Sequence, residues 1–236
     1  MADVHPPLRS YGRLKSRPIK PRQAALVETR LPGLRIPPGP VDPRVLMPAA
    51  RETWLEIGFG GGEHMAAQAA RAPDVLLLGA EPFLNGVASA VRHIDEQALT
   101  NVRILDGDAR DLIERLPDGS LTQVFILFPD PWPKSRHQKR RIVQPQTVAA
   151  LARLLQLGGR LRFASDVASY VDQALGLILA NPLFRWSAES ANDWRAPPAD
   201  HVTTRYEDKR LGDCAPVFLD FQRVRGSASL VGDHST

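Results

Sequence analysis

Short apolar segments alternate with amphipathic segments along most of the chain, beginning at Trp54. The apolar segments have the length of buried strands, and the segments between them have the spacing of helices that bury one face. We expect strands at residues 54–57, 75–78, 102–105, 124–128, 160–164, 184–188 and 217–223. We expect helices at residues 63–71, 84–97, 111–116, 145–155 and 167–180, a turn at 158–159 and a loop at 190–203. This alternation predicts an α/β protein with a mostly parallel sheet covered on both faces.

The first 50 residues follow a different pattern, because they are rich in proline and in basic residues. We expect little regular structure there, apart from a short helix at residues 23–28. Residues 1–44 carry nine Lys and Arg residues against three Asp and Glu residues, whereas the whole chain has a net charge of +4. A polyanion is the partner that this imbalance favours, and a solvated tail is the alternative. The expected organisation is a basic arm at 1–50, a domain at 51–225 and a flexible tail at 226–236.

Length and composition exclude several classes of protein. The 236 residues permit one α/β domain with appendages or two small domains. Cys214 is the only cysteine, so no intrachain disulfide is expected. No apolar run reaches the length that spans a bilayer, and the N-terminus is charged where a signal peptide would be apolar. We therefore expect a cytoplasmic protein. We also expect no metal site, because His64, His93 and His201 lack the spacing of metal ligands and are read as surface or core histidines.

Acidic residues recur where the expected strands end. Glu81, Asp108, Asp130 and Asp166 follow four of these strands, and Glu56 lies inside the first strand, just before the glycine turn. A single acid at such a place usually caps a helix or is solvated. The carboxyl ends of parallel strands meet at one edge of the sheet, which is the edge where open α/β sheets bind ligands. We therefore expect these carboxylates to lie together in a binding site.

A glycine turn, GFGGG at residues 58–62, connects the first strand to the first helix of the domain. A dinucleotide site would need G-x-G-x-x-G, but its third position is Glu63, which would face the pyrophosphate. The alternative pattern is E-x-G-x-G-x-G, which is fulfilled by Glu56, Gly58, Gly60 and Gly62. It resembles the first motif of the S-adenosylmethionine methyltransferases, whose ligand carries a sulfonium cation and no phosphate. Nearby carboxylates favour such a ligand over a dinucleotide.

The fourth expected strand leads into FPDPWPKSRHQKRR at residues 128–141, here called the signature loop. Proline cannot continue a central ladder, so the strand ends at Pro129. Asp130 and Trp132 then precede a dense cationic run, a combination that suits a base in a pocket and a phosphate backbone outside it. The alternative is a solvated loop that starts a basic helix. The residues expected to hold phosphates are Lys134, Arg136, Lys139, Arg140 and Arg141.

The signature loop resembles the signature of the bacterial tRNA (guanine-N(7)-)-methyltransferases. The resemblance extends from Trp54 to about Phe221 and is looser over SYGRLKSRPIKPRQ in the arm. It implies a Rossmann-like, seven-stranded, S-adenosylmethionine-dependent methyltransferase fold. It also implies methyl transfer from S-adenosyl-L-methionine to N7 of a guanosine in the tRNA variable loop. The partner would be tRNA, and the oligomeric state is left open between a monomer and a homodimer.

The resemblance also implies roles for individual residues. The donor-binding residues would be Glu56, Gly58, Gly60, Gly62, Glu81, Asp108 and Asp130, with Glu81 at the ribose hydroxyls and Asp108 beside the adenine. The substrate-binding residues would be Lys134, Asp166, Thr204, Arg205, Tyr206 and Glu207. Asp130 is the catalytic candidate, because a carboxylate near the guanine would stabilise the positive charge that develops on the ring.

Several alternatives and departures stay open at this point. Residues 204–207 also fit a helix capping box, and Trp132 either stacks on the base or packs under the loop. The family pattern is broken at Pro82-Phe83, at Ser135 and Gln138, and after residue 207, where Gly212 comes early and Cys214 lies nearer the expected glycine. The alternative functions are a methyltransferase for a DNA or protein amine, an RNA-binding protein without catalysis, and a dinucleotide oxidoreductase.

Overall fold

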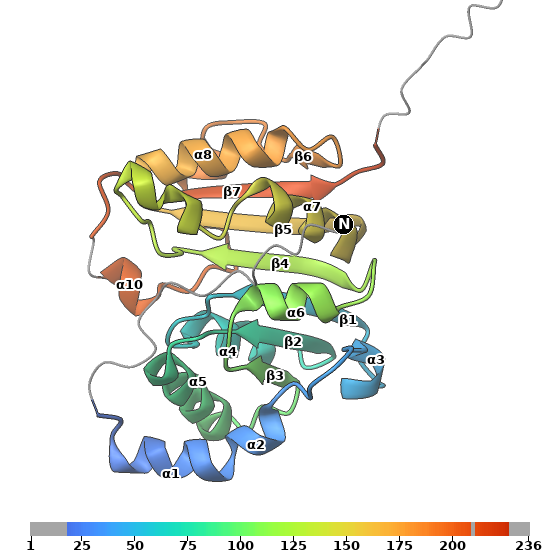
Figure 1. Cartoon of the computed structure of the whole chain (residues 1–236), viewed down its shortest axis with the longest axis vertical. Coiled ribbons are helices and arrows are strands. Elements are labelled where there is room, and N and C mark those ends of the chain that lie inside the picture. Colours follow the sequence, from blue (N-terminus) through green and yellow to red (C-terminus); the bar gives the residue numbers. More distant parts are fainter. Residues whose placement is uncertain (1–17, 209–210, 227–236) are drawn as a thin grey trace, which may run out of the picture.

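The computed structural model describes residues 18–208 and 211–226 (Figure 1). Within these residues, one sheet of seven strands runs in the order β3-β2-β1-β4-β5-β7-β6. β7 is antiparallel to β5 and β6, and the other neighbouring strands are parallel. The predicted fold class is confirmed. The strands are β1 (Glu52–Ile57), β2 (Val75–Ala80), β3 (Val102–Leu105), β4 (Leu121–Leu127), β5 (Leu155–Ser165), β6 (Phe184–Trp186) and β7 (Val217–Arg223).

Helices cover both faces of the sheet, as the alternating pattern predicted. One face packs on α4 (Glu63–Arg71) and α5 (Leu84–Glu96). The other face packs on α6 (Ala109–Arg115), α7 (Pro145–Leu154) and α8 (Ala168–Leu179). α7 begins at a proline, which lacks the N–H group that the first turn of a helix leaves unpaired. The helix bounds agree with the sequence prediction within about two residues.

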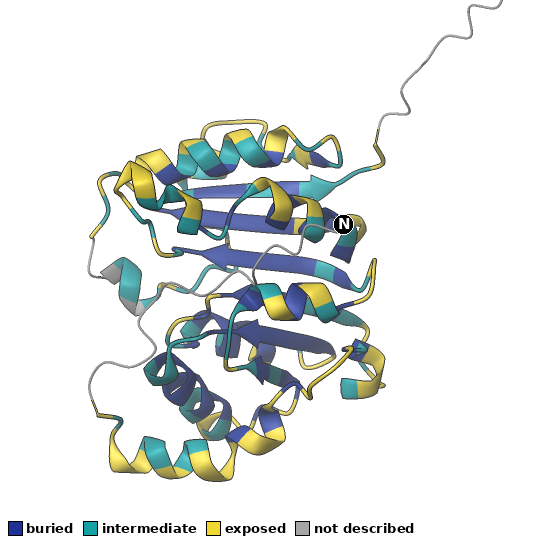
Figure 2. Cartoon of the chain, viewed as in Figure 1, coloured by how far each residue is buried: buried dark blue, intermediate teal, exposed yellow. Residues whose placement is uncertain are grey.

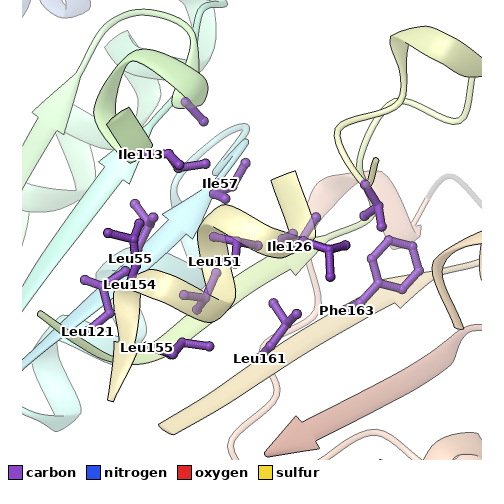
Figure 3. Close-up of a cluster of buried hydrophobic side chains, with 14 of the residues drawn as sticks. Leu55, Ile57, Ile113, Leu121, Ile126, Leu151, Leu154, Leu155, Leu161 and Phe163 are labelled. Carbon is purple, nitrogen blue, oxygen red and sulfur yellow. The ribbon is translucent and has the colours of Figure 1, made fainter. Parts of the chain in front are cut away.

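The central strands are buried on both faces, so they form the rigid frame of the molecule (Figure 2). In the larger cluster, Leu55 and Ile57 of β1 and Ile126 of β4 pack with Leu161 and Phe163 of β5 (Figure 3). Burying a side chain of this size contributes about 1.5–3 kcal/mol relative to leaving it in water. The loops at the carboxyl ends of these strands therefore start from well-held positions.

The N-terminal segment is more regular than expected. It contains α1 (Pro21–Thr29), α2 (Leu31–Leu34) and α3 (Pro43–Leu46). Leu31 is fully buried with α4 and α5, and the amide of Ile36 donates to the carbonyl of Ile104 in β3. The expectation of little regular structure is wrong for residues 18–50, because apolar residues between the basic ones bury against the sheet edge. Residues 1–17 of the expected arm lie outside the described residues.

Two further expectations are corrected by the bounds of the strands and helices. β5 begins at Leu155, so the expected turn at Gly158-Gly159 lies inside the strand, where a register shift accompanies Gly158 at φ 83°. α9 (Asn192–Arg195) interrupts the expected loop at 190–203. Of the expected tail, only Gly226 is among the described residues. No described helix has the length and apolar character needed to cross a bilayer, and no metal-binding cluster occurs in the described part.

Candidate functional site

Four predicted site residues share the carboxyl edge of the sheet. Glu81 follows β2, Asp130 follows β4 and Asp166 follows β5, while Tyr206 comes from the C-terminal part of the chain. Burial raises the pKa of Tyr206, and the negative charges of Asp166 and Asp130 raise it further. The charge of Asp130 likewise contributes to the raised pKa of Glu81. The structure therefore brings these groups within electrostatic reach of one another, as the strand-end pattern predicted.

The glycine turn beside this edge is open on the side of its first glycines. Gly58, Gly60 and Gly62 have φ values of 72°, 53° and 79°, which L side chains rarely adopt. A Cβ atom at Gly58 or Gly60 would meet nothing within 4 Å, so a ligand has room to approach the backbone there. A Cβ atom at Gly62 would lie 2.5 Å from the Cβ of Ala90 in α5. Gly62 is therefore required by the packing of α5 against the turn.

Glu81 ties the glycine turn to the end of β2. Its Oε2 accepts from the amide of Gly60 at 2.9 Å, and its Oε1 accepts from the amide of Phe83 at 2.8 Å. Burial raises the pKa of Glu81 to about 7, although these two hydrogen bonds act in the opposite direction. Each oxygen keeps a further lone pair for a ligand hydroxyl. Pro82, a departure from the family pattern, has no amide to donate, and the following Phe83 supplies the donor instead.

Glu56 is buried behind the glycine turn and pairs with a histidine. Its Oε2 lies 2.7 Å from Nδ1 of His64, whose Nε2 lies 3.1 Å from Nε2 of Gln68. The His64 ring also packs edge-on against Phe125 of β4, with the ring centroids 4.8 Å apart. His64 is a core histidine, one of the two alternatives that the sequence left. The sequence analysis missed its pairing with Glu56, although a strand, a tight turn and the first helical turn bring such positions together.

Asp108 caps a helix in this structure. Its Oδ1 accepts from the amide of Arg110 at 3.0 Å, which satisfies a free N–H at the start of α6. Its Oδ2 also pairs with the Arg110 guanidinium at 3.0 Å. The contact with adenine that the resemblance implied for Asp108 stays a prediction.

The signature loop leaves β4 with a strained backbone and is tied down by a buried arginine. Phe128 and Trp132 have φ values of 48° and 41°, and such conformations cost about 1–3 kcal/mol each for residues other than glycine. Arg141 is fully buried, and its guanidinium donates to the carbonyl of Pro131, to Ser169 and to Gln173 of α8. The expectation that Arg141 binds phosphate is therefore wrong, because its side chain is fully buried and makes four hydrogen bonds inside the protein.

The exposed cations of the loop lie on the 3₁₀ helix η1 (Ser135–Arg140) and just before it. Lys134, Arg136 and Lys139 are exposed there. The Arg140 guanidinium lies 5.0 Å from the ring centroid of Trp132, so the indole packs on its own loop. Stacking of Trp132 on a nucleotide base stays a prediction, as do the phosphate contacts of the exposed cations.

The segment at 204–207 folds as the capping box that was one of its two interpretations. The Thr204 amide donates to Oε2 of Glu207 at 2.8 Å, and the Glu207 amide donates to Oγ1 of Thr204 at 3.4 Å. Oε1 of Glu207 lies 2.8 Å from Nε2 of His201. These contacts start the short helix α10 (Arg205–Asp208) and hold Tyr206 near Phe128, with the ring centroids 6.2 Å apart. The side chain of Arg205 lies outside the described residues, and the substrate roles of this segment stay predictions.

Asp166 is buried beneath the loop at residues 211–214. Its carbonyl accepts from the amides of Asp213 and Cys214 at 2.9 and 3.0 Å. A Cβ atom at Gly212 would lie 2.3 Å from Cγ of Asp166, so only glycine fits there without movement. This loop therefore requires glycine at position 212, one of the two positions between which the sequence left the family's glycine open.

Comparisons with known proteins concern the family and the fold of the chain. A family model described as "Putative methyltransferase" matches residues 50–218. A tRNA (guanine-N(7)-)-methyltransferase of Caulobacter sp. (strain K31) is 64% identical, and the match covers 93% of this chain and 97% of that protein. A protein of the same name from Hyphomonas neptunium is 53% identical over 92% of this chain and 100% of its own.

Solved structures with this fold include a 16S rRNA (adenine(1408)-N(1))-methyltransferase from Catenulisporales acidiphilia. The TM-score is 0.54 at 16% sequence identity, and the match covers 81% of this chain and 98% of that chain. At this level of identity, the likeness concerns the fold.

Proposed function

The chain belongs to the tRNA (guanine-N(7)-)-methyltransferase family, and we propose that it methylates N7 of a guanosine in the variable loop of tRNA, with S-adenosyl-L-methionine as the methyl donor. The observation that carries this proposal is the carboxyl edge of the sheet. There, a carboxylate-lined site lies beside an open glycine turn and a loop with exposed cations. A tRNA substrate agrees with the expected cytoplasmic location.

The residues at the edge fit the proposed donor better than a dinucleotide. The site presents the carboxylates of Glu81 and Asp130, which favour a cation, and Glu63 lies in the first turn of α4, where a pyrophosphate would need free amides. When bound, S-adenosyl-L-methionine supplies an electrophilic methyl group on a positively charged sulfur. Glu81 would hold the ribose hydroxyls through its remaining lone pairs, with Gly58 and Gly60 leaving room for the ligand. Asp108 would lie beside the adenine.

The acceptor needs positioning more than deprotonation. Guanine N7 carries an in-plane lone pair and no proton, so no general base has to remove one. The chain must hold the base in line for transfer, and such orientation supplies roughly 7–11 kcal/mol of barrier reduction in favourable cases. Asp166, Tyr206 and residues 204–207 would hold the guanosine near Asp130, and the effect of Asp166 and Asp130 on the pKa of Tyr206 supports this arrangement.

Asp130 is suited to stabilise the charge that reaches the guanine ring. It follows the strained Phe128, it is accessible to solvent, and desolvation by the surrounding protein raises its pKa. A carboxylate in this place lowers the energy of a base that becomes cationic, and it also accepts hydrogen bonds from guanine N–H groups. Lys134 and the other exposed cations of the signature loop would hold the phosphates on either side of the base.

Methyl transfer from labelled donor to an unmodified tRNA transcript, followed by nucleoside analysis, tests this function. The expected product is 7-methylguanosine, formed in the transcript and absent from a matched transcript whose variable-loop guanosine is replaced by adenosine. Label in another nucleoside would retain the donor site and contradict the acceptor. Methylation of a protein or DNA amine in place of tRNA would contradict the proposal altogether.

A further inference from the structure

One segment of the acceptor side lies across the sheet face formed by β4, β5 and β7. We call residues 200–207 the acceptor segment, because they carry the capping box and Tyr206. The ring of His201 lies 4.9 Å from that of Phe218 in β7, and the ring of Tyr206 lies near Phe128 after β4. Ring contacts of this kind set how close the segment lies, but they fix its direction along the sheet only weakly. A polar anchor at the start of the segment does this instead.

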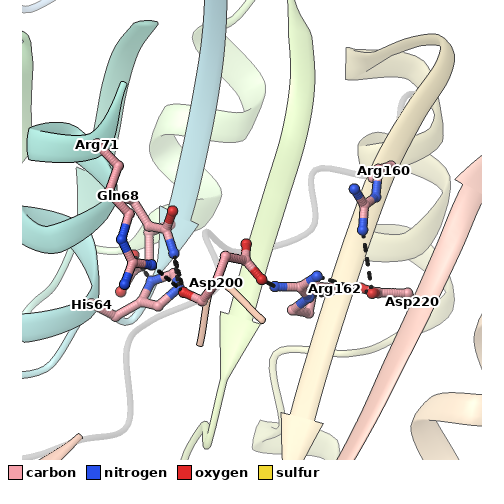
Figure 4. A network of polar contacts seen from close by, with 8 residues as sticks. His64, Gln68, Arg71, Arg160, Arg162, Asp200 and Asp220 are labelled. Carbon is pink, nitrogen blue, oxygen red and sulfur yellow. Dashed lines mark hydrogen bonds and ion pairs between the residues drawn. The ribbon is translucent and has the colours of Figure 1, made fainter. Parts of the chain in front are cut away.

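Asp200 is that anchor, because both of its polar ends are held. Its carboxylate Oδ1 accepts from the Arg162 guanidinium of β5 at 2.7 Å (Figure 4). Its backbone carbonyl accepts from Nε2 of Gln68 at 2.8 Å and from Arg71 at 2.6 Å. Gln68 and Arg71 both belong to α4, the helix that follows the glycine turn. The first residue of the acceptor segment is thus bonded to the sheet on one side and to the donor-side helix on the other.

The buried charge of Arg162 does not by itself require Asp200. Arg162 is 3% exposed, and its Nε and one terminal nitrogen donate to the two oxygens of Asp220 in β7, at 2.8 and 3.0 Å. Such a bidentate pair already compensates a buried guanidinium. Asp200 is a second carboxylate on the same arginine, contributed by a loop, and its side chain is 45% exposed. What its bond to Arg162 adds is the position of the loop.

The contact between Asp200 and Gln68 of α4 also connects the anchor to the donor side. Nε2 of Gln68 lies within hydrogen-bonding distance of His64, and His64 pairs with Glu56 at the base of the glycine turn. The contacts therefore run without a gap from β1 through α4 to Asp200, and from there to β5 and β7. The place of the acceptor segment is set relative to the same elements that form the donor site.

We propose that Asp200 is a positioning residue for the tRNA base, acting through Arg162 and α4 without touching the substrate. This inference rests on the proposed function, because it assigns the acceptor segment to the guanosine. When the carboxylate is lost, the capping box still closes, since its hydrogen bonds are local. The segment that carries Tyr206 then shifts relative to Asp130, and methyl transfer slows while donor binding is unchanged.

The test compares three variants of the full chain. Asp200→Ala removes the carboxylate, Asp200→Asn keeps an oxygen that accepts from Arg162, and Arg160→Gln is the matched control. Arg160 pairs with Asp220 at 3.4 Å in the same network and has no bond to Asp200. We expect Asp200→Ala to lower kcat/KM for tRNA by about ten- to a hundredfold, because small misplacements are costly in such a reaction. We expect Asp200→Asn to recover part of this loss and Arg160→Gln to resemble the wild type.

A second comparison separates positioning from stability. Asp220→Asn weakens the pair that compensates Arg162, so it should lower the melting temperature more than Asp200→Ala does. Donor affinity, measured by calorimetry without tRNA, should stay within about twofold of the wild type in Asp200→Ala, because a positioning role leaves the donor site intact. The proposal is overturned if Asp200→Ala retains kcat/KM for tRNA within twofold, or if it loses donor affinity and kcat/KM together.

Two further measurements keep the proposal testable in all cases. If Asp200→Ala does not fold, Arg71→Ala removes one donor to the Asp200 carbonyl from an exposed position. A smaller loss in kcat/KM for tRNA is then expected, and wild-type values would overturn the proposal. If the wild-type protein methylates no tRNA, the proposed function fails. Hydrogen exchange at residues 201–207 then still decides whether Asp200 holds the segment, because exchange should rise in Asp200→Ala and not in Arg160→Gln.

Discussion

The residues proposed for the donor side and those proposed for the acceptor side of the site are held in place in different ways. On the donor side, Glu56 reaches His64 across eight positions of the sequence, and Gly60 reaches Glu81 across 21. On the acceptor side, Arg141 reaches Gln173 across 32 positions, and Arg162 reaches Asp220 across 58. The donor side thus depends on a strand, a turn and the next strand. The acceptor side depends on buried arginines whose partners are distant in the sequence: Arg141 joins the signature loop to α8, and Arg162 joins residue 200 to the sheet.

This difference predicts which property a substitution on each side should change. The donor side inherits its geometry from parallel strands whose carboxyl ends meet in any sheet of this kind. The acceptor loops have no such template, and polar anchors such as Arg141 and Asp200 help to hold residues 128–141 and 200–207 in place. Substitutions in these anchors should therefore change stability or the use of tRNA, whereas substitutions on the donor side should change donor affinity.

The largest effect is expected for Arg141→Ala, which removes the anchor of the signature loop. The variant removes a fully buried side chain together with its hydrogen bonds to the partly buried carbonyls of Pro131 and Ser169, so we expect a loss of about 2–5 kcal/mol in the free energy of unfolding. Urea denaturation measures this loss. Arg136→Ala, on the same loop but exposed, should change stability by less than about 0.5 kcal/mol. Equal effects of the two substitutions would remove the distinction between anchor and surface cation.

The next largest effect is expected on kcat, when the charge of Asp130 is removed. Asp130→Asn keeps the shape of the side chain and removes its charge, so kcat should fall by about 10²–10³ while donor affinity changes much less. Single-turnover methylation of tRNA and calorimetric donor titration measure the two quantities. Asp74→Asn, which precedes β2 at the opposite edge of the sheet, serves as the control. Near-normal turnover in Asp130→Asn would refute the role of this carboxylate.

Donor affinity should depend on pH through Glu81, whose pKa burial raises to about 7. Below that pH, the free protein carries a proton on Glu81 that must leave before the carboxylate can accept from ribose hydroxyls. The dissociation constant for the donor should therefore rise by up to about tenfold per pH unit as the pH falls below 7, and level off above it. Titrations in buffers of different ionisation enthalpy report the released proton. Affinity that does not vary between about pH 6 and 8 would contradict this prediction.

The same shift has a consequence for stability. Because the pKa of Glu81 in the folded chain lies above its ordinary value of 4.5, protonation favours the folded state. This stabilisation is complete below pH 4.5 and is lost as the pH rises toward about 7. Bound donor should reverse the trend at neutral pH.

The smallest effect is expected for single exposed cations of the acceptor side. Lys134→Ala and Arg136→Ala should each weaken tRNA binding modestly and reduce the slope of log affinity against log salt by about 1, if each contacts one phosphate. Binding measured over a range of salt concentrations gives the slope. A slope equal to that of the wild type in both variants would place the tRNA backbone elsewhere on the surface.

Much of the donor side followed from the sequence alone. Periodicity predicted the strands and helices, and the glycine turn and the acids at strand ends predicted the edge that carries the site. These inferences succeed because they rest on contiguous residues and on the common direction of parallel strands. Glu81 and Asp130 needed no tertiary information beyond the order of the elements to be placed at one edge.

Only the tertiary structure decided which polar residues are anchors. In the sequence, Arg141 looks the same as Arg136, but the packing of α8 buries the first and leaves the second in water. Arg162 and Asp200 likewise carry no local sign of their pairing. Burial and ion pairing depend on segments that meet only after folding. Together, burial and pairing set the free energy of a charged side chain. The sequence therefore determined the frame and the chemical groups of this protein, and the packing of distant segments decided which charges hold the structure and which are exposed to solvent.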